Sequence, residues 1–281
     1  MASIDTTQDT HAEELPEHKV VNHVLGVALA QVYSLKKGLK LFGEQGKEAM
    51  KTELKQHHDM KVYHPVDPKL LTYLQKKAAL QSLMHLVKKR DGRVRARGCA
   101  DGSKQRNDPG YKKENSASPT VHNDSTVITS AIDAKEKRDV MILDLPGAFL
   151  HALRRAGATK KQLLMVLRGP LAETMVLLNP SLYRPFITYD KNGVAVLYVE
   201  MDKALYGLLE SALDFYLKLS GELKEKGYKI NPYDPCVANK LVKGAQHTVI
   251  WHVDDLKCSH VDPFVNTLFA QWLKSIYGPK I

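Results

Sequence analysis

Apolar positions along the chain recur with two different periods, which separate the expected strands from the expected helices. Short runs rich in β-branched and aromatic residues are typical of buried strands. Such runs occur at residues 139–144, 163–169, 194–201, 236–242 and 247–253. Apolar residues spaced three or four apart predict amphipathic helices instead. These cover residues 44–58, 123–134 and 207–226, and Asp-Pro pairs predict further helices over about 67–83 and 262–277.

The helical spacing also predicts which side chains face the core. They are Ala49, Met50 and Leu54 in the first helix, Val127, Ile128, Ala131 and Ile132 in the second, and Leu208, Ala212, Leu213, Tyr216, Leu219 and Leu223 in the third. Gly227 follows the third helix and suits its C′ position. Residues 1–20 are polar and acidic, which predicts a disordered tail. Residues 21–33 fit a helix and a strand equally well.

Two strand pairs carry turn signals between them. The stretches SLMHLVKK and RVRARGC flank Arg90-Asp91-Gly92, which predicts a hairpin. Alternation along its second strand puts Arg93, Arg95 and Arg97 on one face. In the same way Lys243-Gly244 predicts a hairpin between residues 236–242 and 247–253.

The first of these hairpins is distinguished by its positive charge. The 281-residue chain has a net charge of +10, and residues 86–113 hold ten Lys or Arg against three Asp. A basic excess of that size indicates a polyanionic partner. The plain alternative is a solvated surface, which is what most basic runs are.

Acidic residues, by contrast, stand at the ends of two apolar runs. Asp144 ends one run and is followed at once by Pro146-Gly147, while Asp254 and Asp255 end another. A polar loop tip would explain the Asp-Asp pair. A shared divalent metal would also explain it, because the ion offsets the repulsion between carboxylates. Two such ends suggest neighbouring strands on which three carboxylates meet.

Several classes of protein do not fit the sequence. No run of 18 apolar residues exists, and the first residues lack the pattern of a secretory signal, so we expect an intracellular protein without a membrane partner. Cys99, Cys236 and Cys258 are widely spaced, which indicates neither a disulfide framework nor a zinc site. The histidines at 57, 58, 64 and 85 have no second ligand at suitable spacing and are interpreted as structural or surface residues.

Several of these segments, taken together, are similar to the reverse transcriptase of copia-type LTR retrotransposons. They are Asp144 to Leu150, KALYGLLESALDFY (203–216), NPYDPCVANK (231–240) and WHVDDLKCSH (251–260), with RARGCADGSKQR (95–106) and SPTV (118–121) upstream. The resemblance covers about residues 36–281. It implies an α+β polymerase right hand, with fingers and palm built on an antiparallel sheet backed by helices. The basic hairpin of the fingers would span about 82–106 and the palm about 118–281, after a segment 1–35 that the resemblance does not reach.

The resemblance also implies a chemistry and a set of residues for it. Asp144, Asp254 and Asp255 would be the catalytic, metal-binding residues of an RNA-directed DNA polymerase, holding two Mg²⁺, with Mn²⁺ as a substitute. Arg93, Phe149, Tyr206 and Gly207 would bind the deoxynucleoside triphosphate. Lys88, Lys89, Arg95, Arg97 and His252 would contact an RNA or DNA template and its primer. The expected location is the cytoplasm or a retrotransposon particle, with self-association through apolar surface that a following thumb would cover.

Departures from the family pattern keep other functions open. Asp91 stands where the family carries a Lys, and Arg154 and Arg155, in the divergent segment 153–160, replace acidic residues. Together with the short C-terminal segment, these changes would fit a catalytically inactive nucleic-acid-binding remnant. His252 replaces an aromatic residue, which would leave metal binding intact and alter the contact with the primer end. A metal-dependent phosphatase or nuclease using the same acids is disfavoured, because it would not require the other segments.

Overall fold

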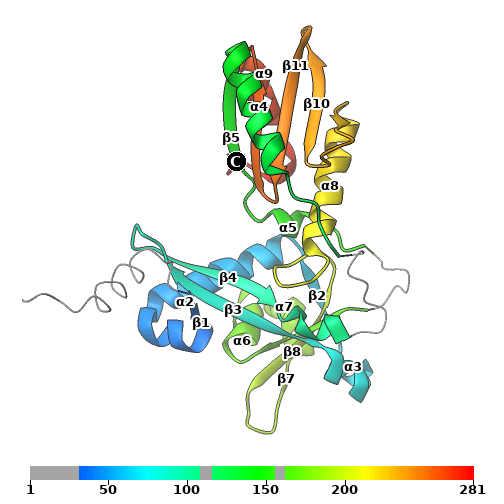
Figure 1. Cartoon of the computed structure of the whole chain (residues 1–281). Helices are drawn as coiled ribbons and strands as arrows, with labels where there is room; N and C mark the ends of the chain where they lie inside the picture. The colour runs from blue at the N-terminus through cyan, green and yellow to red at the C-terminus, as the bar shows by residue number, and fades with distance from the viewer. Residues whose placement is uncertain (1–31, 108–115, 156–161) are drawn as a thin grey trace, which may run out of the picture.

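The computed structural model describes residues 32–107, 116–155 and 162–281, which form two β-sheets, each with its own hydrophobic core (Figure 1). Helices and strands are mixed, as the sequence predicts. The predicted tail and most of the apolar segment 21–33 lie outside the described residues. No helix in the described ranges is long and apolar enough to span a membrane.

The first sheet has seven strands and contains both of the expected strands at 163–169 and 194–201. Its strands are β1 (Val32–Ser34), β3 (Leu80–Lys88), β6 (Leu164–Arg168), β8 (Ala195–Met201) and β2 (Tyr63–Pro65) in spatial order, with β4 (Val94–Ala100) beside β3 and β7 (Thr188–Tyr189) beside β8. All pairs are antiparallel except β3 with β6. The sheet is therefore mixed rather than antiparallel throughout.

Helices lie on both faces of this first sheet, but they cover the two faces unequally. The core on one face includes side chains of α2 (Leu35–Asp59) and α6 (Pro170–Leu178). A smaller apolar cluster on the other face involves only the region around η1 (Pro68–Leu70) and α3 (Tyr73–Ala78). Three further short helices are η2 (Gly102–Asn107), α7 (Pro180–Tyr183) and η4 (Arg184–Phe186).

The second sheet has five strands and is antiparallel throughout. Their spatial order is β5 (Asp139–Asp144), β12 (Asp255–His260), β11 (Ala245–His252), β10 (Val237–Val242) and β9 (Lys229–Ile230). The core on one face of the sheet includes side chains of α8 (Ser211–Glu225) and α9 (Pro263–Tyr277). On the other face, α4 (Asn123–Glu136) is tied to β12 by an ion pair of 2.6 Å between Asp133 and Lys257. Figure 1 shows the short helix α5 (Ala148–His151) between the two sheets.

Both predicted hairpins are confirmed. Strands β3 and β4 pair from Ser82–Ala100 to Lys88–Val94, and β10 pairs with β11 around Lys243 and Gly244. Those two turn residues have φ values of 50° and 80°, the left-handed pattern that a two-residue hairpin turn favours. The burial of alternate residues along β4 leaves Arg95 and Arg97 exposed on one face, as predicted.

The predicted inner face of α4 is wrong. Val127 and Ile128 are 68% and 58% exposed, and the buried residue of this helix is Asp133. The reason lies in the sheet beneath, where Lys257 stands between Ile142 and Ile250 on this face and pairs with Asp133. A helix over such a face turns its polar side inward, because a buried charge must be paired.

Two predicted helix limits are also wrong. The helix expected from residue 67 ends at Ala78, because the following residues pair in β3 with β4 and β6. The long helix expected from Gly207 begins at Ser211, and its predicted end is confirmed by Gly227, whose φ is 89°. In α2, which starts earlier than expected, Met50 and Leu54 are buried as predicted.

Candidate functional site

The two acidic strand ends are neighbours in the second sheet. In the pairing of β5 with β12, Asp144 lies directly opposite Asp255 and Leu143 opposite Leu256. Opposed residues of an antiparallel pair project from the same face, and like charges in such a pair repel. Strand pairing therefore places two carboxylates together where simple stability would disfavour them.

A strained turn brings the third carboxylate to the same place. His252 and Asp255 pair across the β11–β12 turn, and Val253, the first of its two central residues, has a φ of 57°. Positive φ at that position alone is the pattern of a type II′ turn, which favours glycine. For a β-branched residue it costs about 1–3 kcal/mol and persists only where the surroundings enforce it.

One contact that holds the turn comes from the residue that directly follows β5. The Leu145 N–H donates a hydrogen bond of 2.9 Å to the carbonyl oxygen of Asp254. This bond fixes the turn to the end of the strand that carries Asp144. Backbone strain of this kind is concentrated at functional sites, which makes the turn a candidate for one.

The pKa of Asp254 also reflects its closeness to the other two carboxylates. Burial raises the pKa of this carboxyl group, and the negative charges of Asp255 and Asp144 raise it further, while Arg97 acts in the opposite direction. Ionised Asp254 is thus disfavoured by its neighbours. A bound cation would relieve that repulsion.

The donor chemistry suits a hard divalent ion, since carboxylate oxygens are the ligands that Mg²⁺ prefers. The side chains as they stand do not converge, however. Within residues 32–107, 116–155 and 162–281, no three His, Cys, Asp or Glu side chains form a set that could hold a metal ion. Asp144 and Asp255 are exposed, so packing does not fix their carboxylates. The charge and the position of the three carboxylates fit a divalent ion, but their side chains would have to reorient to bind it.

Aromatic residues and an arginine lie beside Asp254. The Tyr206 ring is 4.7 Å from the Phe149 ring, and the Arg97 guanidinium is 5.3 Å from the Tyr206 ring centroid. Burial raises the pKa of the Tyr206 hydroxyl, with a further contribution from Asp254. Two residues predicted to bind the nucleotide, Phe149 and Tyr206, thus meet a predicted nucleic-acid contact. Phe149 also lies 6.3 Å from the Phe215 ring, so it serves the core as well.

Gly207 fastens the basic hairpin to this cluster. Its φ is 88°, and a Cβ here would come within 2.0 Å of the Ala100 carbonyl oxygen. The Ala100 N–H in turn donates a bond of 2.8 Å to the carbonyl oxygen of Tyr206. Only glycine permits backbones to approach so closely, so the contact joins the base of β4 to Tyr206.

The tip of the hairpin is organised differently from its base. The Arg93 guanidinium donates to the Asp91 carboxylate, with Nη2 at 2.6 Å, and the Arg93 N–H donates to the same side chain. Arg93 lies four strand positions from Arg97, roughly 13 Å at the usual rise. Lys88 and Lys89 are exposed at this same end. The structure therefore groups these three residues at the tip, away from the acidic turn.

Two supporting residues could not be recognised as such in the sequence. Glu53 of α2 accepts a hydrogen bond of 2.9 Å from the Gly98 N–H, next to Arg97 on β4. A Cβ on Gly98 would come within 2.5 Å of the His57 ring, which is buried under the strand. The only sequence signal is a glycine inside an otherwise regular strand, which is typical of a close approach.

The two arginines that depart from the family pattern have structural partners. Arg155 donates a hydrogen bond of 2.5 Å to Asp214 of α8, which is 4% exposed. Arg154 donates to the carbonyl oxygen of Met201 at 3.1 Å. These contacts tie the chain after α5 to the start of α8 and the end of β8.

No protein-family model matches the sequence, and no curated protein sequence matches it either.

Proposed function

We propose that this chain is the fingers and palm of an RNA-directed DNA polymerase of the copia-type LTR retrotransposon class. The observation that carries the proposal is the strand register that sets Asp144 opposite Asp255, with Asp254 in the adjoining strained turn. The resemblance of the sequence motifs supplies the reaction. The cluster of acids supplies a place where it would occur.

The reaction joins the primer 3′-hydroxyl to the α-phosphate of a deoxynucleoside triphosphate and releases pyrophosphate. Two Mg²⁺ ions would supply charge stabilisation for the attacking and leaving oxygens. Asp144 and Asp254 would hold them, with Asp255 beside them. Arg97, exposed next to Tyr206, would attract the anionic substrate and its template, and the Phe149 ring would contact the sugar.

A second function has its own support. Asp91 forms an ion pair with Arg93, the residue expected to hold the triphosphate. This pairing favours a nucleic-acid-binding protein of the same origin that has lost catalysis. Its partners would remain RNA or DNA, in the cytoplasm or in an element's particle.

Primer extension on an RNA template, with Mg²⁺ or Mn²⁺, separates the two functions. We expect extension by the native chain and a loss of at least about 100-fold in Asp144→Asn and in Asp254→Asn, because each change removes an anionic ligand. Asp124→Asn is the matched control, since Asp124 is exposed on α4. Extension that survives in both site variants contradicts the assignment. Template binding without any extension by the native chain supports the inactive protein instead.

A further inference from the structure

The second face of the first sheet carries a pocket that the acidic site does not use. Along β6 and β8, alternate side chains belong to two clusters: Leu167 and Leu197 to the core that includes α2, Val166 and Tyr198 to the smaller cluster. The register places Arg168 beside Val196, and Val196 beside Thr188, in one row. The helices η1 and α3 cover only part of this face. Between them and that row lies a pocket of about 330 Å³.

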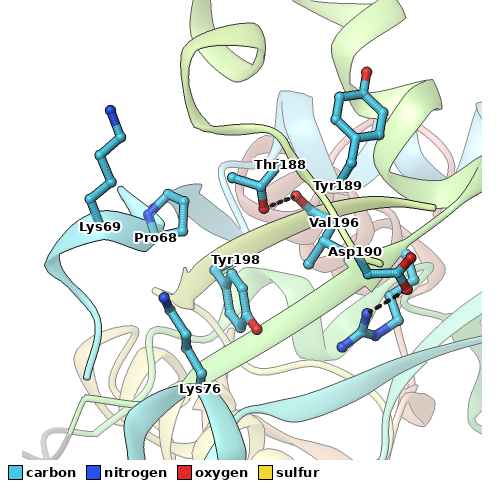
Figure 2. Close-up of a pocket in the computed structure, with 9 residues that line it drawn as sticks. Pro68, Lys69, Lys76, Thr188, Tyr189, Asp190, Val196 and Tyr198 are labelled. Carbon is cyan, nitrogen blue, oxygen red and sulfur yellow. Dashed lines mark hydrogen bonds and ion pairs between the residues drawn. The ribbon is translucent and has the colours of Figure 1, made fainter. Parts of the chain in front are cut away.

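Cations and a flat apolar floor define the pocket. Lys69 of η1 and Lys76 of α3 stand on one wall, and Arg168 stands on the other, 3.8 Å from Asp190. Neither lysine has an ion-pair partner among the described residues. Figure 2 shows the Tyr198 ring between Lys76 and Asp190. The charge of the pocket is therefore positive, over an aromatic ring and the apolar side chains of Pro68 and Val196.

This chemistry suits one kind of ligand. Phosphates need cations, and a base needs a flat ring or apolar surface. A strand has a phosphate on each side of every base, whereas a free mononucleotide has only one phosphate. One phosphate of a strand would meet Lys69 and Lys76, and the other would meet Arg168. The distance of 3.8 Å between Arg168 and Asp190 offsets the charge of Arg168 less than the 2.6 Å pair offsets that of Arg93. An acidic peptide would use the cations but would not require the aromatic floor.

We propose that this pocket binds one nucleotide unit of a single-stranded nucleic acid. Phosphates would lie against Lys69 and Lys76 on one wall and against Arg168 on the other, with the base over Tyr198. In Figure 1, β7 and α3 lie at the opposite end of the molecule from β10 and β11. The site is separate from the three aspartates, and its occupation requires neither metal nor polymerisation.

The test is the fluorescence anisotropy of a short labelled oligothymidylate bound to the full chain, in EDTA. Lys69→Glu combined with Lys76→Glu should weaken binding about tenfold or more and lower the log-log salt slope by about 1.4, which is two single-strand contacts. Lys36→Glu with Lys40→Glu is the matched control. Both of its lysines are exposed on α2, which covers the other face. It should change the affinity less than about twofold.

A second pair of variants tests the base. Tyr198→Leu keeps an apolar floor without the flat ring and should weaken binding about fivefold. Tyr233→Leu is its control, because Tyr233 is an exposed tyrosine (88%) that does not line the pocket. Thermal melting identifies any variant that fails to fold, and Lys69→Gln with Lys76→Gln then replaces the charge reversal.

Three results would overturn the proposal. Equal losses in the two lysine pairs would mean general electrostatics, and competition by polyglutamate as strong as by unlabelled oligonucleotide would mean an unspecific anion patch. Competition by thymidine monophosphate at equal nucleotide concentration would mean a free-nucleotide site. Binding is measured in EDTA, where metal-dependent polymerisation does not occur. Failure of the polymerase proposal is therefore distinguishable from failure of this one.

Discussion

The two charged hairpins of this protein are held in opposite ways. The acidic turn between β11 and β12 is strained at Val253 and is fixed by a neighbouring strand through the Leu145 to Asp254 hydrogen bond. The basic tip between β3 and β4 has its charge satisfied locally, by Asp91 on Arg93. Gly92 at that tip has no atom within 4 Å of the position of a Cβ.

The surrounding structure therefore fixes the position of the charge at the acidic turn, but not at the basic tip. At the acidic turn, neighbouring elements hold Asp254 against repulsion, which is a cost that only a further role would explain. At the basic tip, an ion pair removes the repulsion and costs little. The base of the same hairpin is positioned, through Glu53 at Gly98 and through Gly207 at Ala100. Under the proposed function, we therefore expect Arg97 rather than Arg93 to contact the substrate.

The largest expected effect comes from adding a methyl group at the base of the basic hairpin. Gly207→Ala should destabilise the fold by about 4 kcal/mol, because both the positive φ and the Ala100 carbonyl oxygen exclude a Cβ. Gly92→Ala shares the positive φ but has open space, so it should cost about 1 kcal/mol. Urea unfolding measures both. Equal losses would show that the close approach at Gly207 is not needed.

A smaller and opposite effect is expected at the acidic turn. Val253→Gly should stabilise the protein by about 1 kcal/mol, because relief of the strain exceeds the added flexibility of glycine in the unfolded chain. Lys137→Gly is the comparison, since Lys137 has a φ of 52° without a branched Cβ. Lys137→Gly should gain less stability than Val253→Gly. A midpoint of urea unfolding that falls in Val253→Gly would mean that the turn is not strained.

The smallest expected effect is on the pH dependence of stability, to which Asp254 and Asp91 should contribute with opposite signs. The pKa of Asp254 is raised above 3.8, so its ionisation destabilises the fold as pH rises through that raised pKa. The pKa of Asp91 is lowered by Arg93, so its contribution is present above 3.8 and is lost as pH falls through the lowered pKa. At pH 7, Asp254→Asn should therefore be more stable than the native chain and Asp91→Asn less stable. Both differences should shrink toward acid pH.

These signs can be read from urea midpoints at a series of pH values. The charged groups that act on Asp254 are Asp144, Asp255 and Arg97, and the last opposes the other two. If Asp254→Asn were less stable than the native chain at neutral pH, the repulsion inferred for the acidic cluster would be wrong.

Local pattern was enough to predict the pieces of the candidate site. Asp144 and the Asp254-Asp255 pair each follow an apolar run, and both runs are strands of the second sheet, β5 and β11. They are not neighbours as predicted, because β12, which begins at Asp255, lies between them and brings the acids together. Such runs carry their own signal, because burial requires apolar side chains on every strand of a sheet interior. The basic hairpin could also be predicted, from its Asp-Gly turn and its alternating arginines.

Pairing between segments that are far apart in the chain could not be predicted from the local sequence. Nothing local in β6 shows that it pairs in parallel with β3, more than 70 residues earlier in the chain. The inner face of α4 was mistaken because it depends on Lys257 of a strand far along the chain. The ion pair between Asp91 and Arg93 was missed because Asp91 was interpreted as a lost lysine. The pocket around Tyr198 depends on three separate segments and has no sequence signature.

The proposed function requires Asp144, Asp254 and Asp255 to hold divalent metal at one place. Affinity cleavage tests it directly, because Fe²⁺ bound in place of Mg²⁺ cuts the neighbouring backbone when ascorbate and peroxide are added. We expect cuts near Asp144 and near Asp254 in the same sample, lost together in Asp254→Asn and kept in Asp124→Asn. Cuts confined to other segments, or cuts near Asp144 that persist unchanged in Asp254→Asn, would contradict it.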